Sequence, residues 1–273
     1  MLGHTLWILD ASQDFLVQID LVGDRVVSTV PVPPSAIAAG DGRVLTISPV
    51  GLAGSAPPPL TLDRVDPATG TLRLVRDDLD APPNIAVGLG SAWLAGNDTL
   101  VRVDPMTGQI LADRSIPGAL TAAVACGKLW IQALGPGGAS LDQIDPGTGR
   151  VIWQTAVPEG TLAPQAAAGA CWLLEGDGRI AKLEPGAGIV NRTPPIGMTV
   201  QVAGDAFWET TWDGQLRKVD PTSGQPGGPT WQLPKADLPS NPKFADWRLI
   251  GLDGDTWLLD ATGVVKLGFG SAG

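Results

Sequence analysis

The sequence is poor in the side chains that most often transfer protons or bind metals. It has one histidine, His4, two cysteines and no tyrosine among 273 residues. Histidine is the side chain that titrates near neutral pH, so chemistry that needs an imidazole base is nearly excluded. Cys126 and Cys171 form neither a disulfide framework nor a metal-binding CxxC pair. We expect both to be small buried side chains, with a single disulfide as the alternative.

Long apolar runs and excess positive charge are also missing. No segment reaches the roughly eighteen apolar residues of a membrane span, and Met1–Phe15 has neither a basic leader region nor a small-residue cleavage site. We therefore expect no membrane insertion and no signal peptide, and the compartment stays open. The net charge is −10, with 18 Lys and Arg against 28 Asp and Glu. This balance argues against nucleic acid or an anionic membrane as partner.

A repeated phrase is the strongest positive signal. The sequence LVRVDPMTG at Leu100–Gly108 has near-copies that begin at Leu62, Leu141 and Leu216. Seven segments align on its first five residues, and they begin at Leu16, Leu62, Leu100, Leu141, Ile180, Leu216 and Val264. Each alternates apolar and polar residues with period two, which is typical of a half-buried strand. They recur every 36 to 48 residues, the interval expected of four-stranded propeller blades.

The remaining strands of each repeat can be recognised around this phrase. A short strand centred on tryptophan precedes it, at Trp7, Trp93, Trp130, Trp172, Trp208 and Trp257, with Leu45 at this position in the second copy. A small-residue inner strand such as Asn84–Gly88 comes earlier, from the second copy on, and an outer strand follows the phrase. We predict an all-β fold, a β-propeller of four-stranded antiparallel blades that forms one domain over residues 1–273. Seven blades are favoured and six are the alternative. Closure is imperfect at the termini, since the first copy lacks an inner strand and the last an outer one.

The repeated acid and tryptophan both have structural explanations. In DPxTG, Pro fixes φ, Gly adopts a left-handed conformation, and the Asp carboxylate accepts bonds from the amides that follow. We therefore interpret Asp66, Asp104, Asp145 and Asp220 as turn residues rather than catalytic acids. The repeated tryptophans fill the space between neighbouring blades and belong to the core.

Phrases of this form, followed by a glycine and a Trp-centred strand, resemble bacterial YVTN-type and streptogramin-lyase-like (virginiamycin B lyase-like) repeat propellers. The resemblance covers nearly the whole chain and implies the propeller fold. It implies either a sensor or ligand-binding role or an enzyme. In the lyases it implies a histidine and metal-binding acids near the channel mouth, and this sequence has no histidine after His4.

Candidate site residues lie in the loops expected on one face, around the mouth of the central channel. The hairpin loops between second and third strands contribute Asp10, Asn97, Asp98, Gln132, Glu175, Glu209, Asp260 and Trp212. The entries to the inner strands contribute Asn84, Gln165 and Trp247. Carboxylates, amides and indoles suit a glycan or other small polar ligand, a protein partner or a divalent cation. A wet polar rim without a ligand is an equally good explanation.

We therefore predict a non-catalytic ligand- or protein-binding propeller that acts as a sensor or scaffold. No catalytic residue, metal ligand or cofactor is assigned, although a bound divalent cation is compatible with the acidic loops. The alternative is an enzyme at the channel mouth, either streptogramin-lyase-like or based on paired carboxylates such as Glu175 and Glu209.

Overall fold

The computed structural model describes residues 5–10, 15–20, 23, 25–31, 36–49, 59–66, 69–80, 84–184, 186–196, 199–203, 206–211, 215–232, 248–252, 255–260 and 263–267. All regular structure in these ranges is β-strand, as predicted, so the described residues include no helix able to cross a membrane. The chain divides into two compact units, Met1–Gln154 and Thr155–Gly273. That residues 1–273 form one domain stays a prediction.

The first unit contains four antiparallel sheets, each built from strands that follow one another in the chain. The first sheet comprises β1 (Thr5–Asp10), β2 (Phe15–Asp20) and β3 (Arg25–Pro31). The second comprises β4 (Ala36–Gly40), β5 (Arg43–Pro49), β6 (Leu60–Val65) and β7 (Leu72–Leu79). The third comprises β8 (Asn84–Gly88), β9 (Ser91–Gly96), β10 (Thr99–Val103) and β11 (Ile110–Ser115). The fourth comprises β12 (Ala119–Ala125), β13 (Lys128–Gly135), β14 (Gly138–Ile144) and β15 (Val151–Ala156), whose end passes the unit boundary.

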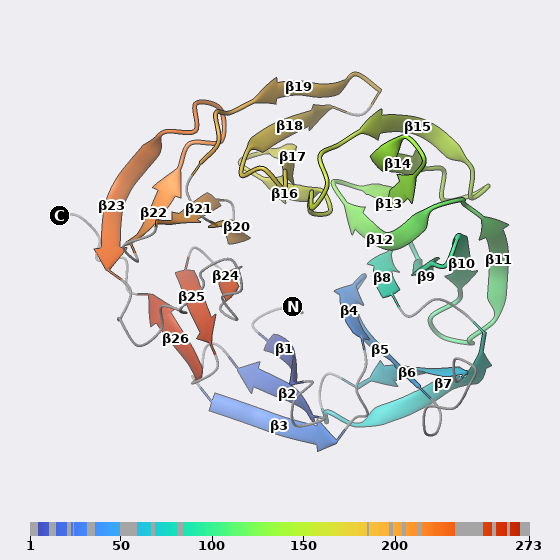
Figure 1. Cartoon of the computed structure of the whole chain (residues 1–273). Coiled ribbons are helices and arrows are strands. Elements are labelled where there is room, and N and C mark those ends of the chain that lie inside the picture. The colour runs from blue at the N-terminus through green and yellow to red at the C-terminus, as the bar shows by residue number, and fades with distance from the viewer. Residues whose placement is uncertain are drawn as a thin grey trace. The chain divides into compact units, whose positions relative to one another are not determined.

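The second unit contains three more sheets of the same kind (Figure 1). The fifth sheet comprises β16 (Gln165–Ala167), β17 (Ala170–Leu174), β18 (Ile180–Glu184) and β19 (Gly188–Arg192). The sixth comprises β20 (Thr199–Ala203), β21 (Ala206–Thr210), β22 (Gln215–Val219) and β23 (Pro226–Gln232). The seventh comprises β24 (Arg248–Leu252), β25 (Asp255–Asp260) and β26 (Gly263–Leu267).

The order of strands predicted for each repeat is confirmed. Five of the seven described sheets run inner strand, tryptophan or leucine strand, phrase strand and outer strand. The first sheet has no inner strand and the seventh no outer strand among the described residues, as the sequence predicts. Within the first unit the inner strand β8 contacts the inner strands β4 and β12. A Cβ on Gly40 of β4 would collide with the carbonyl oxygen of Val87 in β8, so a residue without a side chain is needed there.

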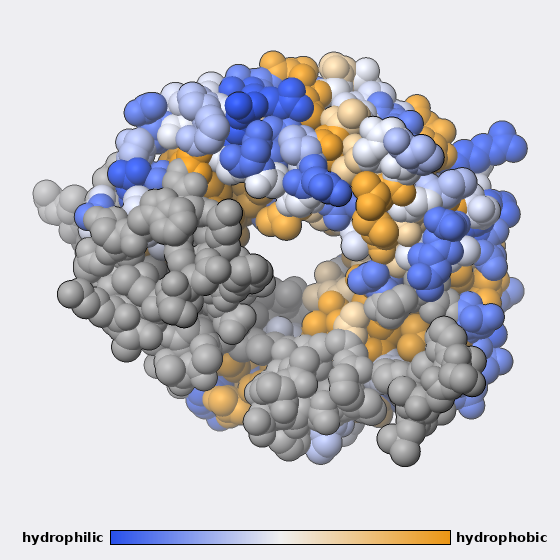
Figure 2. Space-filling model, viewed as in Figure 1, coloured by the Kyte–Doolittle hydropathy of each residue, from blue (hydrophilic) through white to orange (hydrophobic). Residues whose placement is uncertain are grey.

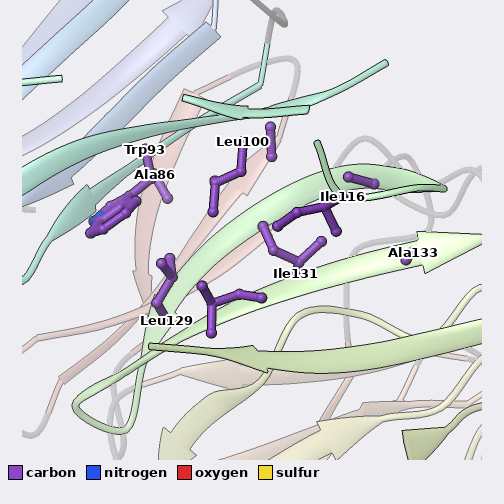
Figure 3. Packing of buried hydrophobic residues seen from close by; sticks show 10 residues of the cluster. Ala86, Trp93, Leu100, Ile116, Leu129, Ile131 and Ala133 are labelled. Carbon is purple, nitrogen blue, oxygen red and sulfur yellow. The ribbon is translucent and has the colours of Figure 1, made fainter. Parts of the chain in front are cut away.

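Within each unit, the core lies between successive sheets. Figure 3 shows the cluster between the third and fourth sheets, where Trp93, Leu100 and Ile116 face Leu129 and Ile131. In the space-filling view of the first unit, hydrophobic residues gather over the inner strands and hydrophilic residues over the outer strands β7 and β11 (Figure 2). Small side chains on the inner strands allow neighbouring inner strands to lie close together, as the sequence predicts.

Five of the six repeated tryptophans are core residues, as predicted, and the burial of Trp257 is not described. Trp93 is 1% exposed, and Trp7, Trp130, Trp172 and Trp208 are also buried. In three sheets the indole N–H donates to the carbonyl oxygen of the last residue of the inner strand, at 3.0 Å for Trp93 to Gly88, 3.0 Å for Trp130 to Ala125 and 2.8 Å for Trp172 to Ala167. The Trp93 and Trp172 rings therefore pack against the following sheet, and all three indoles tie their strand to the inner strand.

The DPxTG segments form the turns from the phrase strand to the outer strand. In the copy after β10, the carboxylate of Asp104 accepts bonds from the N–H groups of Met106 and Thr107, at 2.8 and 2.9 Å. The N–H of Gly108 donates to the Asp104 carbonyl at 2.9 Å, and Gly108 has φ of 73°. The same bonds recur at Asp145 and Asp220, so the interpretation of the repeated acid as a turn residue is confirmed.

These hydrogen bonds lower the pKa of the turn carboxylates. The N–H groups of Met106 and Thr107 hold the pKa of Asp104 below its usual value, and the Thr148 hydroxyl and N–H do so for Asp145. At Asp220 the N–H and hydroxyl of Ser223 have the same effect on the pKa. The ionised form is the better acceptor, which is why these bonds favour it.

The cysteines correct the expectation from sequence. Neither Cys126 nor Cys171 is a free thiol, because both are disulfide-bonded and the chain has no other cysteine. Cys126 lies in the turn between β12 and β13 with φ of 54°, and Cys171 is a buried residue of β17. Two lone cysteines carry no spacing signal for pairing, so the sequence favoured the simpler alternative.

Replacing a repeated tryptophan tests its double role. We expect Trp93→Ala to lower the free energy of unfolding by about 3–5 kcal/mol, because it opens a cavity and leaves the Gly88 carbonyl without its donor. Trp93→Phe keeps most of the volume but loses the donor, so its loss should be smaller. Urea unfolding measures both values. Equal losses for the two variants would show that filling the space between sheets contributes nothing.

The turn carboxylates predict a pH dependence. Their folded pKa values lie below the unfolded value of about 3.9, so their stabilisation is present above that pH and is lost as the pH falls through the folded pKa. The triple variant Asp104→Asn, Asp145→Asn, Asp220→Asn keeps an acceptor but has no charge to lose. Melting temperatures between about pH 2 and pH 6 should therefore fall less steeply on acidification for the variant than for the wild type. Parallel curves would contradict the role of the charge.

Candidate functional site

Three of the predicted site residues converge on one stretch of backbone in the first unit. Asn84 begins β8, Asp98 lies in the β9–β10 turn and Gln132 lies on β13, so they come from two neighbouring sheets. Each contacts the segment from Gly118 to Thr121 at the start of β12. Among the residues expected on the face of the hairpin loops, these three therefore surround one segment of backbone.

A β-bulge interrupts β12 at Leu120. Ala119 pairs with Ala133 and Thr121 with Gln132, so Leu120 has no partner on β13. The Asn84 amide donates to the Leu120 carbonyl at 3.0 Å and fixes this backbone from the neighbouring sheet. A bulge turns a side chain out of the regular pleat, and Leu120 is 48% exposed. An apolar side chain is thus held at the surface among amide groups.

The Asn97–Asp98 turn holds the same segment from the other side. Both residues have positive φ, 51° and 63°, which asparagine and aspartate tolerate better than most residues. The Asp98 carboxylate accepts the Gly118 N–H at 2.7 Å, and its carbonyl accepts the Ile116 N–H at 2.7 Å. Asp98 is therefore engaged in holding the connection between β11 and β12, while the Asn97 side chain is exposed.

Gln132 completes the group. Its amide oxygen accepts the Thr121 hydroxyl at 3.1 Å, and the N–H of the exposed Leu134 donates to the Gly118 carbonyl at 2.8 Å. We call this surface the rim patch. It consists of Asn84, Asn97, Asp98, Leu120, Gln132 and Leu134. Asn84 and Asp98 are bonded to backbone groups, Gln132 is bonded to the Thr121 hydroxyl, and the two leucines are exposed.

The two glutamates of the second unit form ion pairs. The Glu175 side chain is fully buried, and the Arg192 guanidinium of β19 donates to both its oxygens at 3.0 and 3.1 Å. The Glu209 side chain is 2% exposed and accepts a 2.8 Å bond from Arg217 of β22. Gln165, on β16, is half-buried. A buried carboxylate needs such a partner, so these pairs account for both acids as structural groups.

Sequence reasoning missed two further carboxylates. Asp142 on β14 is buried and accepts bonds from the Ser140 hydroxyl and the Gln154 amide, both at 2.9 Å. Asp63 on β6 is at the same position of the phrase, and burial raises its pKa while the Thr61 hydroxyl opposes the shift. One feature of the sequence could have revealed these two carboxylates. They stand at the second position of the phrase, where other copies have the apolar residues Val17, Val101 and Ala181.

The structure does not describe the surroundings of four predicted site residues. Trp212 and Trp247 lie outside the described residues, and of Asp10 and Asp260 only the backbone, at the ends of β1 and β25, is described. Among the described residues no three His, Cys, Asp or Glu side chains gather in a way that would hold a metal ion. These four residues stay predictions.

Comparison with known proteins identifies the fold. No protein-family model matches the chain, and no curated protein matches it. BamB from Moraxella catarrhalis is 13% identical, with a TM-score of 0.57 over 97% of this chain and 88% of that one. AztD from Citrobacter koseri is 14% identical, with a TM-score of 0.63 over 98% and 82%. The Cps50 (Swd1) β-propeller domain from Myceliophteria thermophila is 14% identical, with a TM-score of 0.62 over 98% of both chains. At this identity the likeness concerns the fold alone, and it agrees with the sheets described above: the chain is an all-β protein of the β-propeller class.

The ion pairs of the second unit predict unequal effects of removing either partner. Arg217→Ala leaves the Glu209 charge buried and unpaired, which should cost about 3–5 kcal/mol of unfolding free energy. Glu209→Gln removes the buried charge and should cost less. The double variant should be more stable than Arg217→Ala alone. Urea unfolding measures all three, and an additive double variant would mean that the two groups do not interact.

Proposed function

We propose that this propeller is a non-catalytic binding protein and that the rim patch is its contact surface. The observation that carries the proposal is the bulge at Leu120, which holds an exposed leucine between Asn84 and Gln132. Regular inner-strand packing does not need this bulge. Bulges that re-aim one side chain are common next to functional sites.

The composition of the rim patch favours a protein as the partner. Leu120 and Leu134 supply apolar area, while Asn84, Asn97 and Gln132 surround it with amide groups. An apolar centre with a polar rim is the usual arrangement of a protein interface. The fixed hydrogen bonds around the patch support this proposal, because a preorganised surface loses little conformational entropy on binding. A small polar or glycan ligand is the second candidate, supported by the same amides.

An enzymatic function has weaker support. The carboxylates proposed for a hydrolase, Glu175 and Glu209, are each bonded to an arginine, which leaves neither placed as a general acid. The single histidine, His4, lies outside the described residues. We therefore favour a binding function over an enzymatic one.

A YVTN-type origin of the repeat is a further part of the proposal. It is supported by the repeated phrase and its turn, which resemble those of the YVTN-type and streptogramin-lyase-like propellers. The disulfide-bonded cysteines support action in an oxidising compartment, since such bonds persist there and are rare in the cytosol.

The proposal predicts that one exposed leucine controls partner binding. In Leu120→Asp a charge replaces the apolar centre of the patch, and retention of the partner should fall at least about tenfold. Ile152→Asp is the matched control, because Ile152 is equally apolar and 57% exposed on the outer strand β15. Both immobilised variants and the wild type are compared by quantitative capture of proteins from the producing cells, after circular dichroism has verified folding.

Two results would contradict this proposal. One is that every captured protein is retained equally by Leu120→Asp and Ile152→Asp. The other is that a glycan or divalent cation raises the melting temperature of the wild type while no protein is captured. The second result would instead favour binding of a small ligand.

A further inference from the structure

A pocket of about 410 Å³ opens in the first unit at the strand ends opposite the rim patch. The β4–β5 turn contributes Asp41 and Arg43, and the end of β6 and start of β7 contribute Arg64 and Arg73. Met106, from the turn after β10, lines the pocket on the side of the next sheet. This pocket is separate from the surface proposed above and was not predicted from sequence.

None of the three arginines forms a close ion pair with a carboxylate of the described residues. Arg64 donates to the sulfur of Met106 at 2.9 Å, which is a weak acceptor, and Arg43 donates to the carbonyl of Asp41 at 2.9 Å. Arg73 forms no hydrogen bond or ion pair with any described residue and is exposed. Most of the fifteen guanidinium N–H donors implied by three arginines are therefore available in one pocket.

Two of these arginines also oppose each other across strands. Arg64 on β6 pairs directly with Arg73 on β7. Like charges at such a position are destabilising. The corresponding pairs in other sheets, Gln18–Ser28, Arg102–Ala112 and Lys182–Asn191, avoid the repulsion. The second sheet thus keeps an unfavourable contact that its neighbours do not have.

The next repeat shows how an arginine at this position is satisfied when no pocket is needed. Arg102, the counterpart of Arg64, lies 5.2 Å from the centre of the Trp93 ring. It donates to the Ser91 hydroxyl at 2.8 Å and to the Pro146 carbonyl at 3.1 Å. In the second sheet the counterpart of Trp93 is Leu45 and that of Ser91 is Arg43. The smaller side chain removes the ring, and the acceptor is replaced by a second cation.

Two carboxylates, Asp41 and Asp66, also line the pocket, and each accepts a backbone N–H group. Asp41 accepts the Gly90 N–H at 2.7 Å, and Asp66 accepts the Thr69 N–H at 3.2 Å. Asp104, whose pKa the charge of Arg43 also helps to lower, accepts bonds within its own turn. These acids moderate the positive field of the pocket, and Asp41 and Asp104 form no close ion pair with the three guanidinium groups.

We propose that the pocket binds the oxyanion of a small molecule, either a phosphate or a carboxylate group. Guanidinium groups bind both with paired, charge-assisted hydrogen bonds, and an anion between Arg64 and Arg73 would turn their repulsion into attraction. The pocket volume suits a small ligand rather than a polymer. The net charge of −10 disfavours anions at long range, so affinity comes from these directed bonds.

Calorimetric titration with inorganic phosphate and with succinate, at constant ionic strength, tests the proposal. We expect saturable binding of at least one of them with one site per chain. Arg64→Gln and Arg73→Gln should each weaken it about 10- to 100-fold, since each removes charge-assisted bonds. Which titrant binds identifies the source of the oxyanion. Arg150→Gln is the matched control, because it removes the same charge from an exposed arginine of the fourth sheet's turn.

A second measurement does not depend on ligand. Relief of the Arg64–Arg73 repulsion should raise the melting temperature of ligand-free Arg73→Gln at low salt, and added NaCl should reduce the difference. Arg150→Gln should show no such gain. The proposal is overturned if neither titrant shows saturable binding, or if the binding survives unchanged in both pocket variants.

Discussion

The repeated tryptophan is the residue on which the packing of the described sheets depends. At Trp93, Trp130 and Trp172 the ring is buried, and the indole N–H donates to the carbonyl at the end of the inner strand. The ring also faces a polar residue of the phrase strand, since Trp93 pairs with Arg102 and Trp208 with Lys218. One side chain such as Trp93 thus separates the sheets, attaches the inner strand and covers a cation.

The consequences of this arrangement are clearest at Leu45, where the tryptophan is missing. Leucine still fills part of the apolar core and is fully buried with Ile47 and Leu62. It cannot cover the guanidinium of Arg64 as the Trp93 ring covers that of Arg102. The Arg64 guanidinium has no ring to cover it and lines the arginine pocket instead, so a change in the core accompanies a feature of the surface.

Much of the fold could be predicted because its signals are local. Alternation along the phrase, the small residues of the inner strands and the DPxTG turn each depend on residues a few positions apart. The pairing of Glu175 with Arg192 depends instead on a cross-strand neighbour, which the phrase does not specify. The bulge at Leu120 is fixed by Asn84 from another sheet, and the pocket needs Met106, 42 residues from Arg64. No sequence pattern predicts that two lone cysteines are disulfide-bonded.

Arg64 and Arg102 show why function must be sought where the repeat departs from its own rule. They are the same residue at the same position of the phrase, and their cross-strand neighbours differ. Arg102 is satisfied by a ring, a hydroxyl and a carbonyl, and so contributes to stability. Arg64 faces a leucine, a second arginine and a sulfur, an environment that costs stability until an anion enters it. A residue of the second kind is explained by binding and not by folding, whereas the regular positions need no ligand to explain them.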